Sequence, residues 1–250
     1  MSGHSKWSSI KHKKAATDAK RGQLFTKLAR EISLAAREGG GDPEMNARLR
    51  LAVQRARDSN MPKDNIERAT QRGAGGAEGE SLTEITYEGY GPGGTAVLVE
   101  AVTDNRNRTV AEVRNAFQRG GGNLAETGAV AWQFEERGVI VVDATAHDVD
   151  EVQLAAIEAG ALDISADEDI VEVITERDQL EAVRRALSEA GIEAVRAELA
   201  QLPSNVIALD EAKAIQALRL LEKLDELDDV ARVFSNADFP AEALEALAAS

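Results

Sequence analysis

The sequence predicts an α+β protein with a helical N-terminal domain, a discontinuous α/β middle domain and an inserted ferredoxin-like βαββαβ domain. Two patterns predict this class: apolar residues recur at helical spacing over residues 20–73, and β-rich runs begin near residue 82. The charge divides at nearly the same place. The first 73 residues hold 16 Lys and Arg against 8 Asp and Glu, whereas the remaining 177 hold 13 against 36. A basic module therefore precedes an acidic body, which favours a polyanionic partner at one end.

Residues 1–79 are expected to form the basic helical domain, with an N-terminal arm and a closing linker. The first helix begins near residue 20 and ends at Gly39-Gly40-Gly41. Its packed face holds Leu24, Leu28, Ile32 and Ala35, and its other face is expected to stay basic through Lys20, Lys27, Arg30 and Arg37.

Asp42 and Pro43 predict the start of a second helix, because they form an N-cap followed by a proline. The expected buried stripe of this helix is Met45, Leu49, Ala52, Val53 and Ala56. Asn60-Met61-Pro62 ends it, and a third helix over residues 63–72 uses Ile66 and Ala69 for packing. The glycine-rich stretch from Gly73 to Gly79 is the expected linker.

The middle domain is expected to begin with a β-hairpin. Residues 82–87 and 95–102 are β-rich and are joined through Tyr90-Gly91-Pro92-Gly93-Gly94. A helix marked by Val110, Val113 and Phe117 follows and ends at Gly120-Gly121-Gly122, and residues 129–134 are expected to form another strand.

The acidic insertion is expected over residues 138–203. Its strands and helices follow the order βαββαβ, which is that of the split-βαβ unit. Residues 139–200 hold 4 basic residues against 16 acidic ones, so this part is a poor candidate for phosphate contact. The helix predicted from Asp210 to Leu227 and the strand from Val230 to Phe234 lack partners of their own. We expect them to return to the first sheet, which makes residues 80–137 and 204–250 one discontinuous domain.

The chain shows none of the patterns that hold nucleotides or metals through phosphate loops, dinucleotide-binding glycines, zinc-binding histidines or EF-hand carboxylates. It has no Cys, so disulfides, thiol catalysis and Cys-ligated zinc are excluded. No run of about 18 apolar residues is present. We therefore expect no catalytic residues, no cofactor or metal, no small-molecule substrate, no membrane contact and a cytoplasmic location.

The N-terminal arm is the first candidate contact surface. Its basic residues face a single acid, Asp18, and are Lys6, Lys11, Lys13, Lys14, Lys20 and Arg21. A solvated tail would account for the charge alone. Trp7 favours a functional contact, because a large aromatic among short polar residues either packs on the body or stacks on a base or sugar.

A second candidate lies at Arg106 and Arg108, just before a helix whose Thr109 and Glu112 have the spacing of a capping box. Positive charge there opposes the helix dipole by up to about 1 kcal/mol. An anion bound at the helix start would resolve the conflict. An ion pair with Asp104 or with the acidic inserted domain would resolve it equally well.

The sequence resembles the YebC/PmpR family. The resemblance spans nearly the whole chain and is carried by GHSKW at 3–7, KHKK at 11–14, DAKR at 18–21, FTKLAREI at 25–32, GGGDP at 39–43, NMPKDNIERA at 60–69, YEGYGPGG at 87–94 and TDNRNRT at 103–109. It implies a three-domain α+β protein of the bacterial cytoplasm. It also implies a probable transcriptional regulator that binds DNA, in a family whose mitochondrial branch activates translation and whose bacterial members are linked to ribosomes stalled on proline-rich nascent chains. The family supplies no catalytic residues.

The sequence thus predicts a non-enzymatic nucleic-acid-binding regulator of gene expression, as a DNA-binding transcriptional regulator or, alternatively, a ribosome- or RNA-associated translation factor that relieves stalling. A metal-dependent nuclease is a distant third. The connection at residues 39–43 is long for a helix-turn-helix, so we expect recognition of shape and charge more than base sequence. The expected contact residues are Lys6, Trp7, Lys11, His12, Lys13, Lys14, Lys20, Arg21, Lys27, Arg30, Arg106, Arg108 and Arg114.

Overall fold

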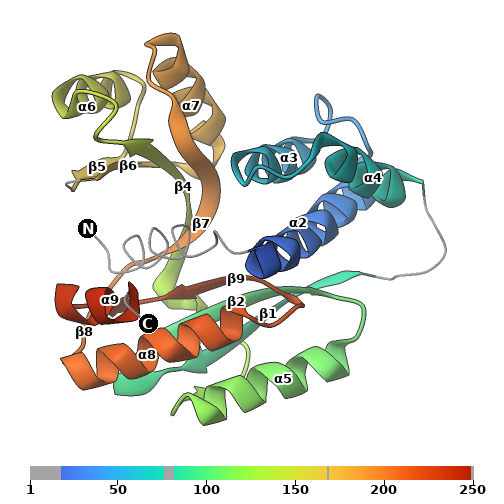
Figure 1. The fold of residues 1–250 in the computed structure, drawn as a ribbon, viewed down its shortest axis with the longest axis vertical. Helices are drawn as coiled ribbons and strands as arrows, with labels where there is room; N and C mark the ends of the chain where they lie inside the picture. The colour runs from blue at the N-terminus through green and yellow to red at the C-terminus, as the bar shows by residue number, and fades with distance from the viewer. Residues whose placement is uncertain (1–17, 76–81, 168, 249–250) are drawn as a thin grey trace. The chain divides into compact units, whose positions relative to one another are not determined.

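The computed structural model describes residues 18–75, 82–167 and 169–248 (Figure 1). The described chain divides into two compact units. The smaller one contains Gln54–Asn60 and Glu135–Leu202, and we call it the ferredoxin-like unit. The larger unit contains the rest of the described chain. Within these residues, no helix has both the length and the apolar character that crossing a membrane requires.

The helical N-terminal region consists of α2 (Asp18–Gly39), α3 (Ala47–Asp58) and α4 (Lys63–Ala74). All three expected helices are therefore confirmed. Their packing largely follows the expected spacing. Leu24 and Ala52 are only partly buried, and the expected packing residues that are buried are Leu28, Ile32 and Ala35 on α2, Leu49, Val53 and Ala56 on α3, and Ile66 and Ala69 on α4.

The start of α3 differs from the prediction. Asn46, not Asp42, stands before its first turn, and the Asn46 side-chain oxygen accepts a hydrogen bond from the N–H of Leu49 at 3.0 Å, as an N-cap does. The amide of Asn46 also donates to the carbonyls of Ala35 and Gly40 at 2.8 Å each. Met45 falls outside the helix and is 84% exposed, so its assignment to the buried stripe was wrong.

Gly73 was predicted to open the linker, but it lies inside α4 and is buried. A Cβ at this position would stand 2.2 Å from the carbonyl oxygen of Ser33 on α2. The glycine therefore allows α4 to approach α2 closely and does not mark a flexible segment.

The sheet of the larger unit has the strand order β3-β1-β2-β9. Its strands are β1 (Thr83–Tyr90), β2 (Ala96–Thr103), β3 (Asn123–Leu124) and β9 (Val230–Ser235). β1 and β2 form the expected hairpin through a short 3-10 turn at Pro92–Gly94. β9 pairs antiparallel with β2, which confirms that the C-terminal strand returns to this sheet. The short strands β8 (Ile207–Ala208) and β10 (Ala237–Asp238) pair with each other.

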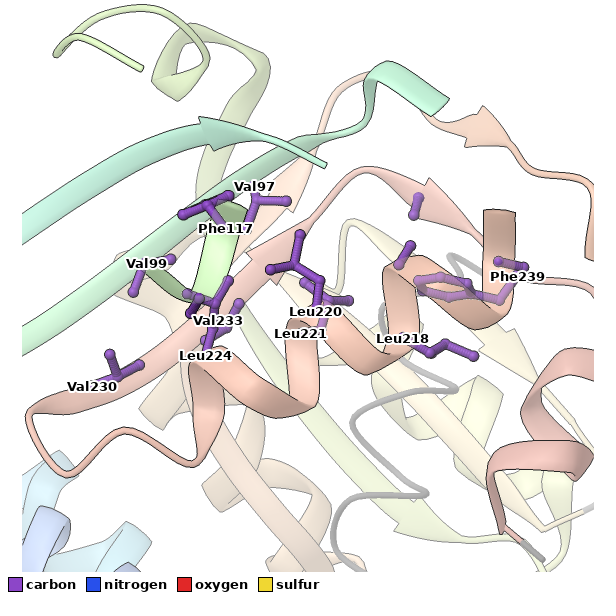
Figure 2. Packing of buried hydrophobic residues seen from close by; sticks show 14 of the residues in the cluster. Val97, Val99, Phe117, Leu218, Leu220, Leu221, Leu224, Val230, Val233 and Phe239 are labelled. Carbon is purple, nitrogen blue, oxygen red and sulfur yellow. The ribbon is translucent and has the colours of Figure 1, made fainter. Parts of the chain in front are cut away.

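Helices α5 (Arg106–Arg119) and α8 (Glu211–Asp225) cover one face of this sheet. Figure 2 shows their main cluster of buried side chains, in which Val97 and Val99 of β2 meet Phe117 of α5 and the leucines of α8. The C-terminal helix α9 (Ala241–Ala248) adds to the same core. On the other face, Val102 packs with Leu34 of α2. β2 is therefore buried on both sides, which explains its almost continuous apolar sequence.

The strand predicted over residues 129–134 was wrong. A 3-10 turn at Ala131–Gln133 occupies half of this stretch and leads into β4 (Phe134–Asp143). The buried carboxylate of Glu88 accepts hydrogen bonds from the backbone N–H groups of Gly128, Val130 and Ala131. These donors are consequently occupied by a side chain and do not enter a strand ladder.

The ferredoxin-like unit contains β4, α6 (Val149–Glu158), β5 (Asp163–Ala166), β6 (Ile170–Thr175), α7 (Leu180–Glu189) and β7 (Ala194–Pro203). The sheet order β5-β6-β4-β7 places β6 between β4 and β5, antiparallel to both. This arrangement is that of a split βαβ unit, so the predicted βαββαβ topology and the α+β class are confirmed.

Candidate nucleic-acid interface

The start of α5 carries the two arginines that the sequence had singled out. Asn105 caps the helix, because its side chain accepts from the N–H of Arg108 at 3.1 Å, so the predicted capping box at Thr109 was wrong. Arg106 and Arg108 therefore lie in the first turn, where no acidic residue is present. Their charges oppose the helix dipole, as the sequence indicated.

The anion that balances Arg108 belongs to the protein itself. The side chain of Asp229, in the turn before β9, is 2% exposed and accepts from Nη2 of Arg108 at 2.7 Å. It also accepts from Nη1 of Arg30 at 2.7 Å and from the hydroxyls of Thr103 at 3.1 Å and Thr109 at 2.8 Å. We call these five residues the Asp229 cluster.

Asp104 completes the neutralisation of Arg108 through a second ion pair at 2.8 Å. Of the two ion pairs that the sequence offered as alternatives, the one with Asp104 is present, and Asp229 supplies a further anion that the sequence did not indicate. Burial alone would raise the pKa of Asp229, but hydrogen bonds from Arg108, Thr109 and Thr103 outweigh it, so this pKa lies below its usual value. The hydrogen bonds that Arg108 donates to Asp229 and Asp104 raise the pKa of Arg108.

Helix α2 turns two of its expected contact residues inward. Lys27 is 8% exposed and donates through Nζ to the carbonyl oxygen of Asp225 at the end of α8. Arg30 donates to the carbonyl of Asp228 at 2.8 Å as well as to Asp229. The last carbonyls of a helix lack intrahelical partners and carry partial negative charge, so they attract cations. The expectation that this face of α2 stays basic was therefore wrong at Lys27 and Arg30.

The other expected contact residues form two groups, those whose side chains the structure describes and those that lie outside the described residues. Arg21, Arg106 and Arg114 are exposed. The candidates that lie outside the described residues are Lys6, Trp7, Lys11, His12, Lys13 and Lys14, and the side chain of Lys20 is likewise not described. Among the described residues, no three His, Asp or Glu side chains gather where they could hold a metal ion.

A connection of helix-turn-helix length does occur, but between α3 and α4. Residues 59–62 join these helices, and Asn60 adopts a left-handed conformation with φ of 57°. The exposed surface of α4 carries both signs of charge, with Lys63 and Arg68 beside Asp64 and Glu67. Lys63 pairs with Glu67 at 3.5 Å, and Arg68 donates to Asn65 and to the carbonyl of Asp64. These side chains are engaged along their own helix.

Comparison with known proteins gives one family for the whole chain. The family model described as the TACO1/YebC protein N-terminal domain matches residues 5–76, and the model of the TACO1/YebC second and third domain matches residues 82–237. A probable transcriptional regulatory protein of Dehalococcoides mccartyi strain CBDB1 is 56% identical over 245 residues, with 98% of each chain covered.

A second relative, a probable transcriptional regulatory protein of Dictyoglomus turgidum, is 50% identical over 248 residues, covering 99% of this chain and 100% of its own. The crystal structure of a conserved hypothetical protein from Aquifex aeolicus is similar with a TM-score of 0.83 and 45% identity, over 89% of this chain and 92% of that one. The similarity thus extends over both units described above.

Proposed function

The chain belongs to the TACO1/YebC family, and from this premise we propose that it is a non-enzymatic, nucleic-acid-binding regulator of gene expression. Its curated relatives are named probable transcriptional regulatory proteins, and DNA is accordingly the first candidate ligand. The observation that carries the proposal is the division of charge, with 16 basic residues against 8 acidic ones before Gly73 and the reverse balance after it. We place its activity in the cytoplasm.

The proposed contact surface is the arm, with the exposed arginines of the body in support. The arm contributes Lys6, Trp7, Lys11, His12, Lys13 and Lys14, the start of α2 contributes Lys20 and Arg21, and the body contributes Arg106 and Arg114. Lys27, Arg30 and Arg108 are assigned to the fold instead, because backbone carbonyls and Asp229 already hold them. The ferredoxin-like unit is acidic and repels phosphate.

Recognition by shape and charge fits these residues better than reading of base edges. A recognition helix needs polar side chains that are available to bases in the major groove. The only described connection of suitable length leads into α4, where Lys63 pairs with Glu67 and Arg68 donates to Asn65. We therefore propose weak discrimination among DNA sequences.

A second candidate is a translation factor that binds structured RNA or the ribosome. The specific observation in its favour is Trp7 within a lysine-rich segment, since phosphate contacts combined with aromatic stacking suit RNA loops. DNA and RNA would be bound by the same arm, so the two candidates share their contact residues and differ in the nucleic acid that occupies them.

Purification of the full chain from its native cells, followed by sequencing of the bound nucleic acid, tests the proposal. We expect DNA or RNA to accompany the wild-type protein and to be depleted when Lys11, Lys13 and Lys14 are replaced by Ala. DNA fragments would support the transcriptional regulator, and ribosomal RNA the translation factor. Absence of both from crosslinked wild-type preparations would reject nucleic-acid binding.

A further inference from the structure

The loop between β3 and β4 is fixed by a buried acid. Glu88 of β1 is 4% exposed, and its carboxylate accepts from the N–H groups of Gly128 at 2.6 Å, Val130 at 2.7 Å and Ala131 at 2.8 Å. Burial alone would raise the pKa of Glu88, but the three N–H donors outweigh it and lower this pKa. The carboxylate is therefore ionised at neutral pH, and its charge-assisted hydrogen bonds hold the loop backbone.

Trp132 follows directly in this loop and is 73% exposed. Its indole Nε1 donates to the carbonyl oxygen of Ala129 at 3.1 Å, and the hydroxyl of Tyr90 donates to the same oxygen at 3.2 Å. The polar edge of the indole is thus satisfied within the loop. The ring remains at the surface with its orientation restrained by that bond.

The next residue is also held in place. The backbone carbonyl of Gln133 accepts from the N–H of Ser204 at 2.8 Å, and its side-chain oxygen accepts from Asn236 at 3.1 Å. Glu88 and Gln133 thus fix the loop on both sides of Trp132 without help from the indole.

The exposure of Trp132 therefore has no evident structural purpose. A buried Trp removes about 150–250 Å² from water, and most of that stabilisation is forgone here. A rigid, exposed aromatic ring on a fixed backbone is the arrangement that proteins use to stack on a nucleobase, because every base offers a π face.

We propose that Trp132 is a stacking platform for an unpaired nucleobase. The inference rests on the proposed nucleic-acid-binding function and adds a contact outside the basic arm. Residues 125–133 include Glu126 and no Lys or Arg, so the contact is made to a base and not to phosphate. Bases in a duplex are already stacked on their neighbours, whereas those in single strands and RNA loops are available.

Stacking and phosphate contacts can be separated by their salt dependence. Only phosphate neutralisation releases counterions, so loss of a stacking contact should lower affinity without changing the slope of log K against log salt. Replacing Trp132 by Ala should weaken binding of single-stranded oligoadenylate RNA about tenfold, leave the slope unchanged, and leave binding of a blunt-ended duplex unchanged. Trp132→Phe should restore most of the affinity.

The measurement uses the full chain carrying Trp7→Phe, so that Trp132 is the only fluorophore of its type. Oligoadenylate RNA and single-stranded oligoadenylate DNA of the same length should both quench the emission of Trp132. The strand whose binding affinity falls more on Trp132→Ala identifies whether RNA or DNA is the preferred ligand. Met45→Ala is the matched control, because Met45 is an exposed apolar residue at 84% and should leave every affinity unchanged.

The failures of this inference and of the proposed function are distinguishable. In one outcome the wild-type chain binds nucleic acid, Trp132→Ala binds oligoadenylate with the same affinity as the wild type, and oligoadenylate does not quench Trp132 in the Trp7→Phe chain. The stacking platform is then wrong and the proposed function stands. If Trp132→Ala weakens duplex and single strand equally and lowers the melting temperature, Trp132 is structural. If the wild-type chain binds none of the probes, the proposed function fails first.

Discussion

Replacing Asp229 by Ala is expected to lower the free energy of unfolding by about 3 kcal/mol, because breaking a buried ion pair leaves its partners without their counter-charge. Asp229 accepts from Arg30, Arg108, Thr103 and Thr109, and its side chain is 2% exposed. The loss is placed at the lower end of the usual range because Arg30 and Arg108 are 25% and 42% exposed and can regain water. Urea unfolding at neutral pH measures it.

The pH dependence of the same variant identifies the charge as the cause. The pKa of Asp229 is lowered in the folded chain, so its contribution is fully present above the unfolded pKa of about 3.9 and is lost as the pH falls through the folded pKa. The difference between the wild type and Asp229→Ala should therefore shrink below about pH 4. Arg106→Gln, an exposed change in the same helical turn, should stay within about 0.5 kcal/mol of the wild type. A loss that is equal at pH 3 and pH 7 would assign the effect to packing.

Replacing Lys11, Lys13 and Lys14 together by Ala is expected to reduce the slope of log K against log salt by about 2 to 3 units. If each of these lysines neutralises one phosphate, affinity near 0.1 M salt should fall by about a hundredfold. Binding titrations of one duplex and one structured RNA over a range of salt concentrations measure both quantities.

Two controls separate the arm from a general change of charge. Lys-to-Arg changes at the same three positions should keep the slope. Lys213→Ala with Lys223→Ala, two exposed positions on α8, should also keep it, because these side chains pair with Asp210 and Glu226. An unchanged slope in the Ala variant of the arm would exclude these lysines as the main contact.

The sequence predicted those parts of the fold whose signals are local. Helical spacing identified α2, α3 and α4, and the Gly-Pro-Gly-Gly turn identified the β1–β2 hairpin. The order of strands and helices identified the ferredoxin-like topology, because connection rules leave few alternatives for such a chain.

The interactions that the sequence missed join residues that are far apart. Arg108 and Asp229 are separated by 121 positions, and Lys27 and Asp225 by 198, so no local pattern indicates that they meet. The positive charge of Arg108 at the start of a helix, where it opposes the dipole, was a signal that the local sequence did contain. It indicated that an anion was needed without showing which residue supplies it.

The strand predicted over residues 129–134, around Trp132, was wrong for a related reason. Its apolar residues have the composition of a strand, but Glu88, 40 to 43 positions earlier, takes the backbone donors that a strand would use. The signal available in the sequence was the acidic residue Glu88 directly after the β-rich run at residues 82–87. A buried carboxylate of this kind requires donors, and the structure supplies them from the loop.

Competition binding at physiological salt tests the central claim most directly, namely that the basic arm binds nucleic acid by charge and shape. The labelled complex is formed with one genomic duplex and challenged with random DNA and with ribosomes. We predict that unrelated duplexes compete within about tenfold of one another and that ribosomes or structured RNA compete at least as well. A single duplex that withstands about a thousandfold excess of random DNA and is indifferent to ribosomes would contradict the account, because it would require base-specific readout.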